Sequence, residues 1–345
     1  MSAATQATAA AAQQHESDRA AYRATLVELA RADRRIWCLD SDMGGLEKQF
    51  QAELPDQYLD LGIAEANLMS VGAALASTGL LPFVNTMAAF ASARALEQVK
   101  IDIAYHALPV RIVGTHSGFS AAHLGPTHHA QQDLAVMRSL PHMTVLTPAD
   151  PAETVRMVNA AAQLPGPVYI RLGRGPTDPV YPGPAGFTVG KAVTLRTGGD
   201  VTLVAAGSHP VLFALEAARR LAAEGIEATV LNMHTIKPLD VPALVHAAEH
   251  TAGLVTVEDH SVLGGLGGAV GEALAEHRPA RVLRVGMADA FCARPGDHRT
   301  QLKAAGVSPE HVIAAARAVL TGRSSPSSTE VPSAEASDIT KESAS

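Results

Sequence analysis

The fold is decided in residues 58–85, which read YLDLGIAEANLMSVGAALASTGLLPFVN. Residues 58–62 and 81–85 are short apolar runs typical of buried strands, and an Ala- and Leu-rich helical pattern separates them. A strand, a helix and a second strand in this order are typical of parallel strands joined by a crossover helix. This stretch therefore predicts a parallel strand–helix–strand unit.

The same alternation of short β-branched runs with longer helical patterns extends along the chain in both directions. The strand-like runs lie at residues 36–40, 58–62, 81–85, 110–116, 143–148, 168–172, 201–207, 228–233, 253–259 and 281–287. Parallel strands with crossover helices place helices on both faces of a sheet. The whole pattern predicts an α/β protein with mostly parallel sheets.

One stretch interrupts this pattern. Residues 173–187, GRGPTDPVYPGPAGF, contain four Pro and four Gly, which break regular elements. We therefore expect two consecutive three-layer α/β domains, at residues 16–180 and 187–322, joined by a linker at residues 181–186.

Both ends of the chain differ in composition from the rest. Residues 1–15 are rich in Ala and Gln, and residues 323–345 are rich in Ser, Glu and Pro. Neither segment has the apolar periodicity that repays the entropy of ordering. We expect a disordered leader and a disordered tail.

The composition excludes several classes of protein. The 345 residues are 47% hydrophobic and 18% charged, and no apolar run approaches the roughly 18 residues of a membrane helix. A net charge of −7 argues against a nucleic-acid-binding face, which needs concentrated basic residues. Only Cys38 and Cys292 occur, too few for a disulfide framework or a cysteine zinc site. Without a basic, apolar leader, we expect a cytoplasmic protein.

Glu65 is the first candidate for chemistry, because it follows the strand-like residues 58–62 and opens the helical pattern. Ligands of parallel α/β sheets bind beyond the carboxyl ends of the strands. A carboxylate in the first helical turn is ordinarily a cap or dipole partner worth about 0.3–1 kcal/mol. Taken alone, Glu65 fits that structural role better than a catalytic one. The motifs around it favour the catalytic role.

Several short motifs share the order and spacing of one enzyme family: GIAEANL (62–68), TMAAFASARALEQV (86–99), THSGF (115–119), GPTHH (125–129) and LTPADP (146–151). Together they resemble the pyrimidine-binding half of transketolase. Further motifs resemble the transketolase C-terminal domain: GSHP (207–210), TIKPLD (235–240) and VTVEDHSVLGGLGGAV (255–270). The resemblance runs from about Arg19 through the second domain.

The resemblance implies thiamine pyrophosphate as cofactor, with Glu65 hydrogen-bonded to a ring nitrogen of its aminopyrimidine. The proton that this glutamate supplies favours the tautomer that activates the thiazolium carbon, so the carboxyl group has to hold a proton near neutral pH. Burial among apolar neighbours such as Ile63, Leu68 and Met69 would favour the neutral form.

Two more residues match family residues near the cofactor. Phe90 matches the aromatic residue that packs on the pyrimidine ring, and plain core packing is the alternative. Asp42, in the loop after the strand-like residues 36–40, matches an acid near the cofactor. Its alternative is a turn or cap role.

Histidines gather within one short stretch: His116, His123, His128 and His129. A metal site with imidazole ligands is one hypothesis. No Asp, Glu or Cys lies at ligand spacing inside this stretch, which argues against a metal. We therefore expect no metal ligands in this chain.

The resemblance gives these histidines a role with the substrate. His116 matches a histidine that contacts the substrate phosphate, and His128 matches one that lines the channel beside the reacting carbons. Arg19 and Arg174 match arginines that bind the same phosphate, for which a planar guanidinium is suited. Without the resemblance, both arginines would be ordinary surface residues.

The sequence departs from the family where the substrate is recognised. The family usually reads GEDGPTH, whereas this chain reads AHLGPTH, so Ala122, His123 and Leu124 replace a glycine and two acids. The second acid normally binds a substrate hydroxyl next to the reacting carbonyl, and Leu124 cannot form that hydrogen bond. A phosphate-binding serine of the family is replaced by Leu46. Because Glu65 is retained, these departures indicate a changed substrate in an active enzyme.

A full transketolase chain carries a further domain in front, where a G-D-G motif and an asparagine hold magnesium and the pyrophosphate. This sequence has no G-D-G, and residues 264–270, GGLGGAV, depart from G-x-G-x-x-G at Val270. We therefore expect the C-terminal subunit of a split transketolase. An N-terminal subunit would supply the diphosphate-binding domain and the Mg²⁺ ligands, in an α2β2 assembly with the cofactor between chains.

Three hypotheses follow. The first is the C-terminal subunit of a two-component, thiamine-dependent ketol transferase acting on ketose donors and aldehyde acceptors. The second is the β subunit of a 2-oxo-acid dehydrogenase, which the THSGF and GPTHH motifs fit less well. The third is a non-catalytic subunit that keeps the fold, which the retention of Glu65 and Phe90 disfavours.

Overall fold

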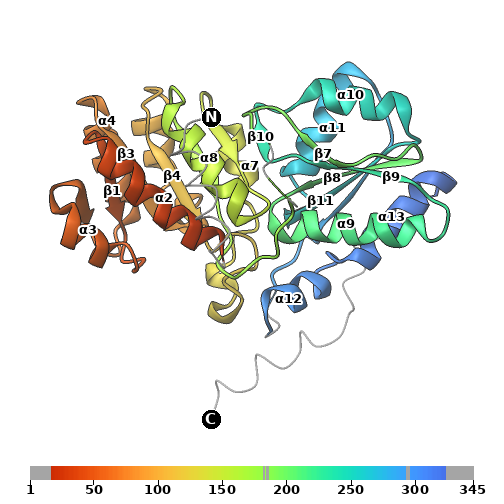
Figure 1. Ribbon diagram of the computed structural model, residues 1–345, viewed down its shortest axis with the longest axis horizontal. Coiled ribbons are helices and arrows are strands. Elements are labelled where there is room, and N and C mark those ends of the chain that lie inside the picture. Colours follow the sequence, from red (N-terminus) through yellow and green to blue (C-terminus); the bar gives the residue numbers. More distant parts are fainter. Residues whose placement is uncertain (1–16, 182, 184–185, 293–295, 324–345) are drawn as a thin grey trace, which may run out of the picture.

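The computed structural model describes residues 17–181, 183, 186–292 and 296–323. Within these ranges the chain forms two sheets, which lie side by side with helices packed around each (Figure 1). The predicted leader, and the predicted tail beyond Arg323, lie outside the described residues.

The first sheet has seven strands in the order β10-β5-β6-β4-β3-β1-β2. Its strands are β1 (Ile36–Asp40), β2 (Tyr58–Asp60), β3 (Leu81–Met87), β4 (Arg111–Thr115), β5 (Thr144–Leu146), β6 (Val168–Arg171) and β10 (Thr235–Lys237). Strands β1 to β6 pair in parallel, as the alternation of the sequence predicted. Only β10 runs antiparallel, against β5.

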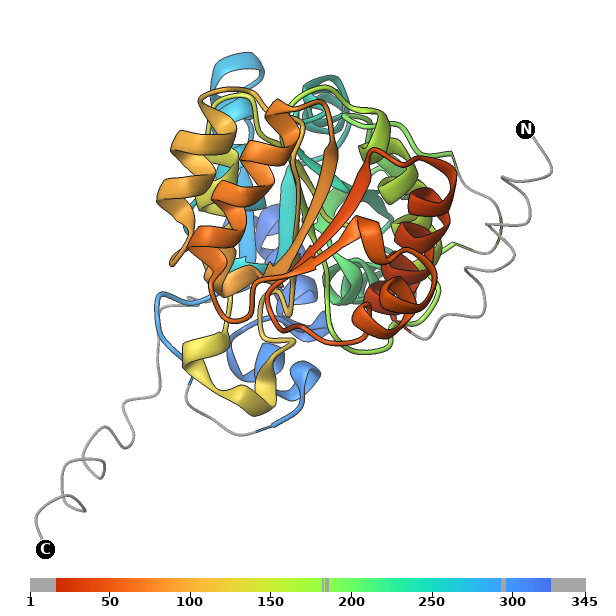
Figure 2. The ribbon, with the colours of Figure 1, turned by 90° about the vertical axis from the view of Figure 1, so that its left-hand side faces the viewer.

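Helices cover both faces of this sheet (Figure 2). They are α2 (Asp18–Ala32), α3 (Glu47–Glu53), α4 (Glu65–Ser77), α5 (Ala88–Ala91), α6 (Leu96–Gln98), the π-helix η2 (Val99–Ala104), α7 (Asp133–Ser139) and α8 (Pro151–Gln163). Short 3₁₀ turns add η1 (Pro55–Gln57), η3 (Ala122–Leu124) and η4 (Pro126–His128). Ser17 and Asp150 cap α2 and α8 by accepting hydrogen bonds from backbone N–H groups.

The second sheet has five strands in the order β12-β11-β8-β9-β7. Its strands are β7 (Val193–Arg196), β8 (Val201–Ala206), β9 (Ala228–Asn232), β11 (Leu254–Ser261) and β12 (Val282–Met287). Its helices are α9 (Ser208–Ala222), α10 (Val241–His250), α11 (Leu266–His277), α12 (His298–Ala304) and α13 (Pro309–Thr321). Helices α10 and α11 lie above the sheet in Figure 1, and α9 and α13 lie below it. The predicted α/β class and three-layer architecture are confirmed.

Two strands have no counterpart in the sequence analysis. Both β7 and β10 are short and pair antiparallel, with β9 and β5 respectively. Strand β10 comes from the second half of the chain but completes the first sheet, at the junction of the two halves (Figure 1). Backbone pairing therefore ties the second half of the chain to the first sheet. No helix in the described part of the chain is long and apolar enough to cross a membrane.

Candidate active site

The carboxyl ends of the parallel strands bring the predicted residues to one edge of the first sheet. Asp42 follows β1, Glu65 opens α4 after β2, Phe90 lies on α5 after β3, and His116 follows β4. Because β2, β1, β3 and β4 are adjacent and parallel, these side chains come from neighbouring strand ends. This is the edge at which α/β sheets bind ligands.

Three of the predicted residues lie in one continuous series of contacts. A nitrogen of Arg94 lies 2.9 Å from the Glu65 carboxylate. The same guanidinium lies 4.7 Å from the ring centre of Phe90, and that ring packs edge-on against His128 at 5.3 Å between centroids. We call Glu65, Arg94, Phe90 and His128 the Glu65 group. Sequence analysis did not predict Arg94, although it lies one turn after Phe90 in the same motif.

Glu65 is only 2% exposed, whereas the Arg94 side chain is 52% exposed. Among the described residues, no backbone N–H donates to the Glu65 carboxylate, and Ala64 precedes it as an N-cap without a side-chain bond. Capping therefore does not explain the burial of this acid. Leu68 and Met69 are buried as predicted. The prediction that Ile63 helps to bury Glu65 is wrong for this chain, because Ile63 points outward and is 73% exposed.

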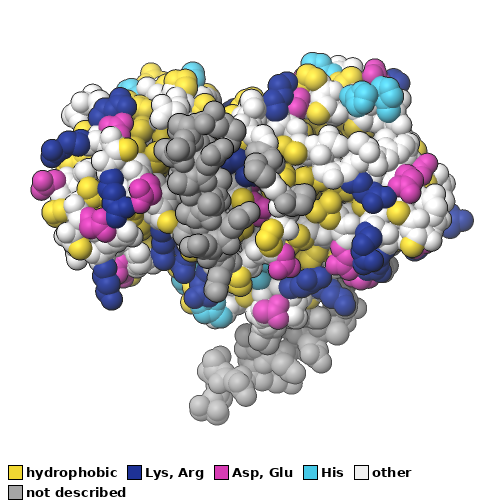
Figure 3. Space-filling model, viewed as in Figure 1, with side chains coloured by type: hydrophobic (Ala, Val, Ile, Leu, Met, Phe, Trp, Pro, Cys, Tyr) yellow, Lys and Arg dark blue, Asp and Glu magenta, His cyan; other side chains and the backbone are white. Residues whose placement is uncertain are grey.

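A second group of side chains is basic. It comprises Arg19, Arg23, His116, His123 and Arg174, which we call the basic cluster. Burial and, to a lesser extent, the charges of Arg19 and Arg174 together lower the pKa of His116 to about 3, so this imidazole is neutral at pH 7. Burial, with Arg23 and Arg174, lowers the pKa of Arg19 to about 10, so Arg19 keeps its charge. Lysine, arginine and histidine side chains also gather at the lower edge where the two halves meet (Figure 3).

The structure thus brings together Arg19, His116 and Arg174, as the resemblance implied, and adds Arg23. His116 has a left-handed backbone with φ of 57°, and its Nδ1 lies 2.9 Å from the Thr115 hydroxyl. This bond fixes the ring at the end of β4.

The departures from the family lie in two segments, the loop after β1 and the 3₁₀ turn η3. Leu46 is largely buried in the core cluster that contains Phe50, and it also lines the cavity that Arg19 and Arg23 line. Leu124 lies in η3 and is 38% exposed, next to the exposed His123. His128 follows in η4, half-buried, with Nδ1 2.9 Å from the Thr127 hydroxyl.

Asp42 stands apart from the Glu65 group. Its side chain is exposed, its φ is 57°, and its backbone N–H donates to Asp60 Oδ1 at 3.3 Å. Within the described residues, no hydrogen bond or ion pair joins it to the Glu65 group. Its role near the cofactor stays a prediction.

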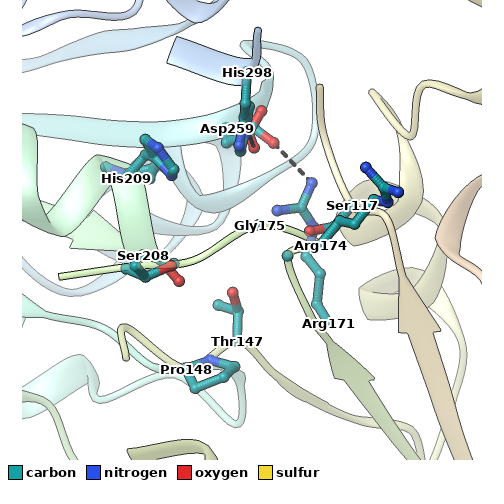
Figure 4. Close-up of a pocket in the computed structure, with 14 residues that line it drawn as sticks. Ser117, Thr147, Pro148, Arg171, Arg174, Gly175, Ser208, His209, Asp259 and His298 are labelled. Carbon is teal, nitrogen blue, oxygen red and sulfur yellow. Dashed lines mark hydrogen bonds and ion pairs between the residues drawn. The ribbon is translucent and has the colours of Figure 1, made fainter. Parts of the chain in front are cut away.

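A small polar cavity lies between the two halves beside the basic cluster (Figure 4). Arg174 and Ser117 lie on one side of it, and His209 lies on the other. His298 Nε2 lies 2.7 Å from Asp259 Oδ2 on a third wall. Sequence analysis quoted the motifs that contain His209 and Asp259 without giving these residues a role. Their proximity to Arg174 depends on how the halves pack.

Comparison with known families supports the resemblance. Residues 17–178 match the transketolase pyrimidine-binding domain, and residues 190–312 match the transketolase C-terminal domain. No cluster of three or more His, Cys, Asp or Glu side chains suited to a metal ion occurs among the residues that the structure describes.

Curated relatives match over most of their length. The chain is 43% identical over 272 residues to the 6-deoxy-6-sulfo-D-fructose transketolase subunit SqwH of Clostridium sp. (strain MSTE9), covering 78% of this chain and 84% of that protein. It is 42% identical over 274 residues to an apulose-4-phosphate transketolase subunit of Phocaeicola vulgatus, covering 79% of this chain and 87% of that protein.

Solved structures agree. A structure described as a split gene transketolase, inactive beta4 tetramer, superposes with a TM-score of 0.81 at 42% identity, covering 88% of this chain and 98% of that chain. Transketolase from Campylobacter jejuni superposes with a TM-score of 0.69 at 21% identity, covering 87% of this chain but only 46% of that chain, which shows the shared fold.

Fold and site together define a two-domain α/β protein that joins a pyrimidine-binding domain to a transketolase C-terminal domain. The chain belongs to the transketolase family of enzymes. It corresponds to the C-terminal part of the enzyme, which some of its relatives carry as a separate subunit.

Proposed function

We propose that this chain is the C-terminal subunit of a two-component transketolase that transfers a two-carbon ketol unit from a ketose donor to an aldehyde acceptor. One observation carries the proposal: Glu65, Phe90 and His128 lie in one series of contacts through Arg94. These are the residues that the resemblance assigns to the cofactor and the reacting carbons. The names of the relatives as transketolase subunits support the same function.

The Glu65 group fits the pyrimidine half of thiamine pyrophosphate. A buried carboxylate lies beside a half-buried aromatic ring, so a planar ring with polar nitrogens would find a hydrogen-bonding partner and a stacking surface. When bound, the cofactor supplies the carbon nucleophile for the transfer. With the cofactor bound, Glu65 would hold a proton at the pyrimidine nitrogen, and Phe90 would pack against the ring. Asp42, at the same edge of the sheet, would lie near the cofactor.

The substrate is held from two sides. His128 lies beside the reacting carbons, and Arg19, His116 and Arg174 bind a terminal anionic group. A neutral His116 donates a hydrogen bond without adding charge, while the arginines supply the charge. The relatives' names include a sulfonated and a phosphorylated sugar, both with such a group. Leu124 occupies the position of the family acid that binds an acceptor hydroxyl, with His123 beside it, so we propose that the enzyme tolerates or prefers an acceptor that lacks this hydroxyl.

A partner subunit completes the enzyme. We propose an N-terminal transketolase subunit that contributes the diphosphate-binding domain and the Mg²⁺ ligands, in a cytoplasmic α2β2 assembly with the cofactor between chains. Subunit designations among the relatives support a partner, and one related structure is described as a tetramer.

The test compares the chain alone with the chain mixed with a candidate N-terminal subunit. Calorimetry with thiamine pyrophosphate and Mg²⁺ should show tight binding only for the mixture, and a panel of ketose donors and aldehyde acceptors should turn over only there. Glu65→Gln in the mixture is the matched control for turnover. Micromolar cofactor binding or turnover by the chain alone would contradict the two-component proposal.

A further inference from the structure

We propose that Arg23 is an additional binding residue of the anion subsite and directly contacts the terminal phosphate or sulfonate of the substrate. This inference rests on the proposed function and extends it to a residue that neither the motifs nor the comparisons assign. The shared chemistry is a tetrahedral oxyanion at the end of a sugar or aldehyde. Planar guanidinium groups bind such oxyanions with paired, charge-assisted hydrogen bonds.

Helix α2 places Arg23 one turn after Arg19, on the same face. Both arginines line a small cavity with Thr115 at the end of β4 and Gly44 in the loop after β1. His116 directly follows Thr115, and the charges of Arg19 and Arg23 both lower its pKa. Arg23 therefore belongs to the same basic cluster as the arginine that the resemblance assigns to phosphate.

The loop after β1 holds Arg23 in place. An Arg23 nitrogen donates to the Gly44 carbonyl, and the guanidinium occupies the space that a Cβ on Gly45 would need. Gly45 has φ of 95°, which also favours glycine. The resemblance places a phosphate-binding serine next in this loop, where Leu46 lines the same cavity but has no hydrogen-bonding group. Arg23 thus supplies polar hydrogens where the loop has lost a hydroxyl.

The charge of the basic cluster is not compensated by protein carboxylates. In the described ranges, neither Arg19, Arg23 nor Arg174 forms an ion pair with Asp or Glu, whereas Arg94 and Arg171 do. Asp40 also lines the cavity, but Ser41 and Met43 N–H groups and the Tyr58 hydroxyl donate to its carboxylate. An anionic ligand would relieve the repulsion among these guanidiniums.

The experiment uses the assembled enzyme with matched acceptors: D-glyceraldehyde, D-glyceraldehyde 3-phosphate and 2-hydroxy-3-sulfopropanal. Arg23→Ala should lower the ratio of kcat/KM for the preferred anionic acceptor over D-glyceraldehyde by about 10- to 100-fold, the loss expected for charge-assisted hydrogen bonds. Arg23→Lys should restore part of it. Arg34→Ala, an exposed arginine just beyond α2, is the control and should leave the ratio unchanged.

The acceptor with the larger loss identifies phosphate or sulfonate as the group bound. An unchanged ratio for both anionic acceptors would overturn the assignment. An equal loss with D-glyceraldehyde would also overturn it, because Arg23 would then be structural.

A binding measurement separates this proposal from the proposed function. Inorganic phosphate or sulfate should raise the melting temperature of the full chain, and Arg23→Ala, unlike Arg34→Ala, should abolish the rise. If the assembled enzyme transferred no ketol unit, the proposed function would fail while this anion effect still supported Arg23. An anion effect that Arg23→Ala left intact would overturn the role of Arg23 alone.

Discussion

The Glu65 group and the basic cluster lie at the same edge of the sheet but are built in opposite ways. In the Glu65 group, a buried carboxylate is paired with Arg94, whose guanidinium also stacks on Phe90. In the basic cluster, Arg19, Arg23 and Arg174 lie near one another without a carboxylate partner in the described chain. The charges of the Glu65 group are therefore paired, whereas the basic cluster has no anionic partner among the described residues. The difference indicates that the first is organised before ligands bind and that the second needs the substrate.

Replacing Glu65 tests the paired region most severely. In the assembled enzyme, Glu65→Gln should lower the rate by about 100- to 10,000-fold, the usual contribution of a proton-transfer group, because an amide hydrogen-bonds without supplying the proton. Exchange of the thiazolium carbon proton, followed by NMR, isolates this step. Glu97→Gln on α6 is exposed and serves as control. Unchanged exchange in Glu65→Gln would reduce Glu65 to a structural residue.

Leu124 tests whether the substrate side has changed. Leu124→Asp should shift selectivity toward hydroxylated aldose acceptors by about ten- to a hundredfold, since one charge-assisted hydrogen bond is worth about 1.5–3 kcal/mol. His123 beside it supplies some polarity and should blunt the shift. The ratio of specificity constants for an aldose and its deoxy analogue measures the effect. Leu124→Ala separates polarity from bulk, and a wild-type preference for aldose phosphates that Leu124→Asp does not alter would contradict this interpretation.

The coupling of Arg94 to Glu65 tests how strongly the first region is paired. Removing one partner of a buried ion pair costs about 3–5 kcal/mol, and the exposure of Arg94 should reduce the cost of Arg94→Gln to about 1–3 kcal/mol. The loss should be smaller in a Glu65→Gln background, with a coupling free energy of about 0.5–2 kcal/mol. Urea unfolding of the four variants gives this value. Additive effects would show that the pair contributes nothing.

Asp18 gives the smallest effect and tests the edge of the basic cluster. Although it precedes Arg19, its carboxylate accepts a 2.6 Å hydrogen bond from Ser208, and burial raises its pKa from 3.8 to about 7. Between these values the folded chain keeps a proton that the unfolded chain releases, so this contribution to stability is lost as the pH rises toward 7.

Asp18→Asn should therefore be more stable than wild type at pH 8. The difference should shrink toward pH 5 by at most about 1.4 kcal/mol per pH unit. Urea unfolding of both proteins at each pH measures this difference in the free energy of unfolding. Burial lowers the pKa of His116 and of His209, but their titration contributes equally to both proteins and cancels in the difference. A difference that did not vary with pH would mean that Asp18 ionises normally in the folded chain.

Local patterns in the sequence determined much of this protein. Strand-like runs alternate with helical patterns, and these periodicities report which face of each element is buried, so the α/β class and the parallel strands could be predicted. The position of Glu65 at the start of a helix after a strand could be predicted for the same reason. Phe90, His116 and His128 could be predicted as site residues from the family motifs, because each motif is a short contiguous segment.

Only the tertiary structure decided which segments meet. Strand β10 is too short to give a periodic signal, and its pairing with β5 joins residues about ninety positions apart. The Arg94–Glu65 pair, the contact of Arg23 with Gly44, and the outward direction of Ile63 depend on how helices pack on the sheet. Burial and pairing between distant segments arise from this packing. A local sequence pattern does not determine which side chains from distant segments a residue will contact.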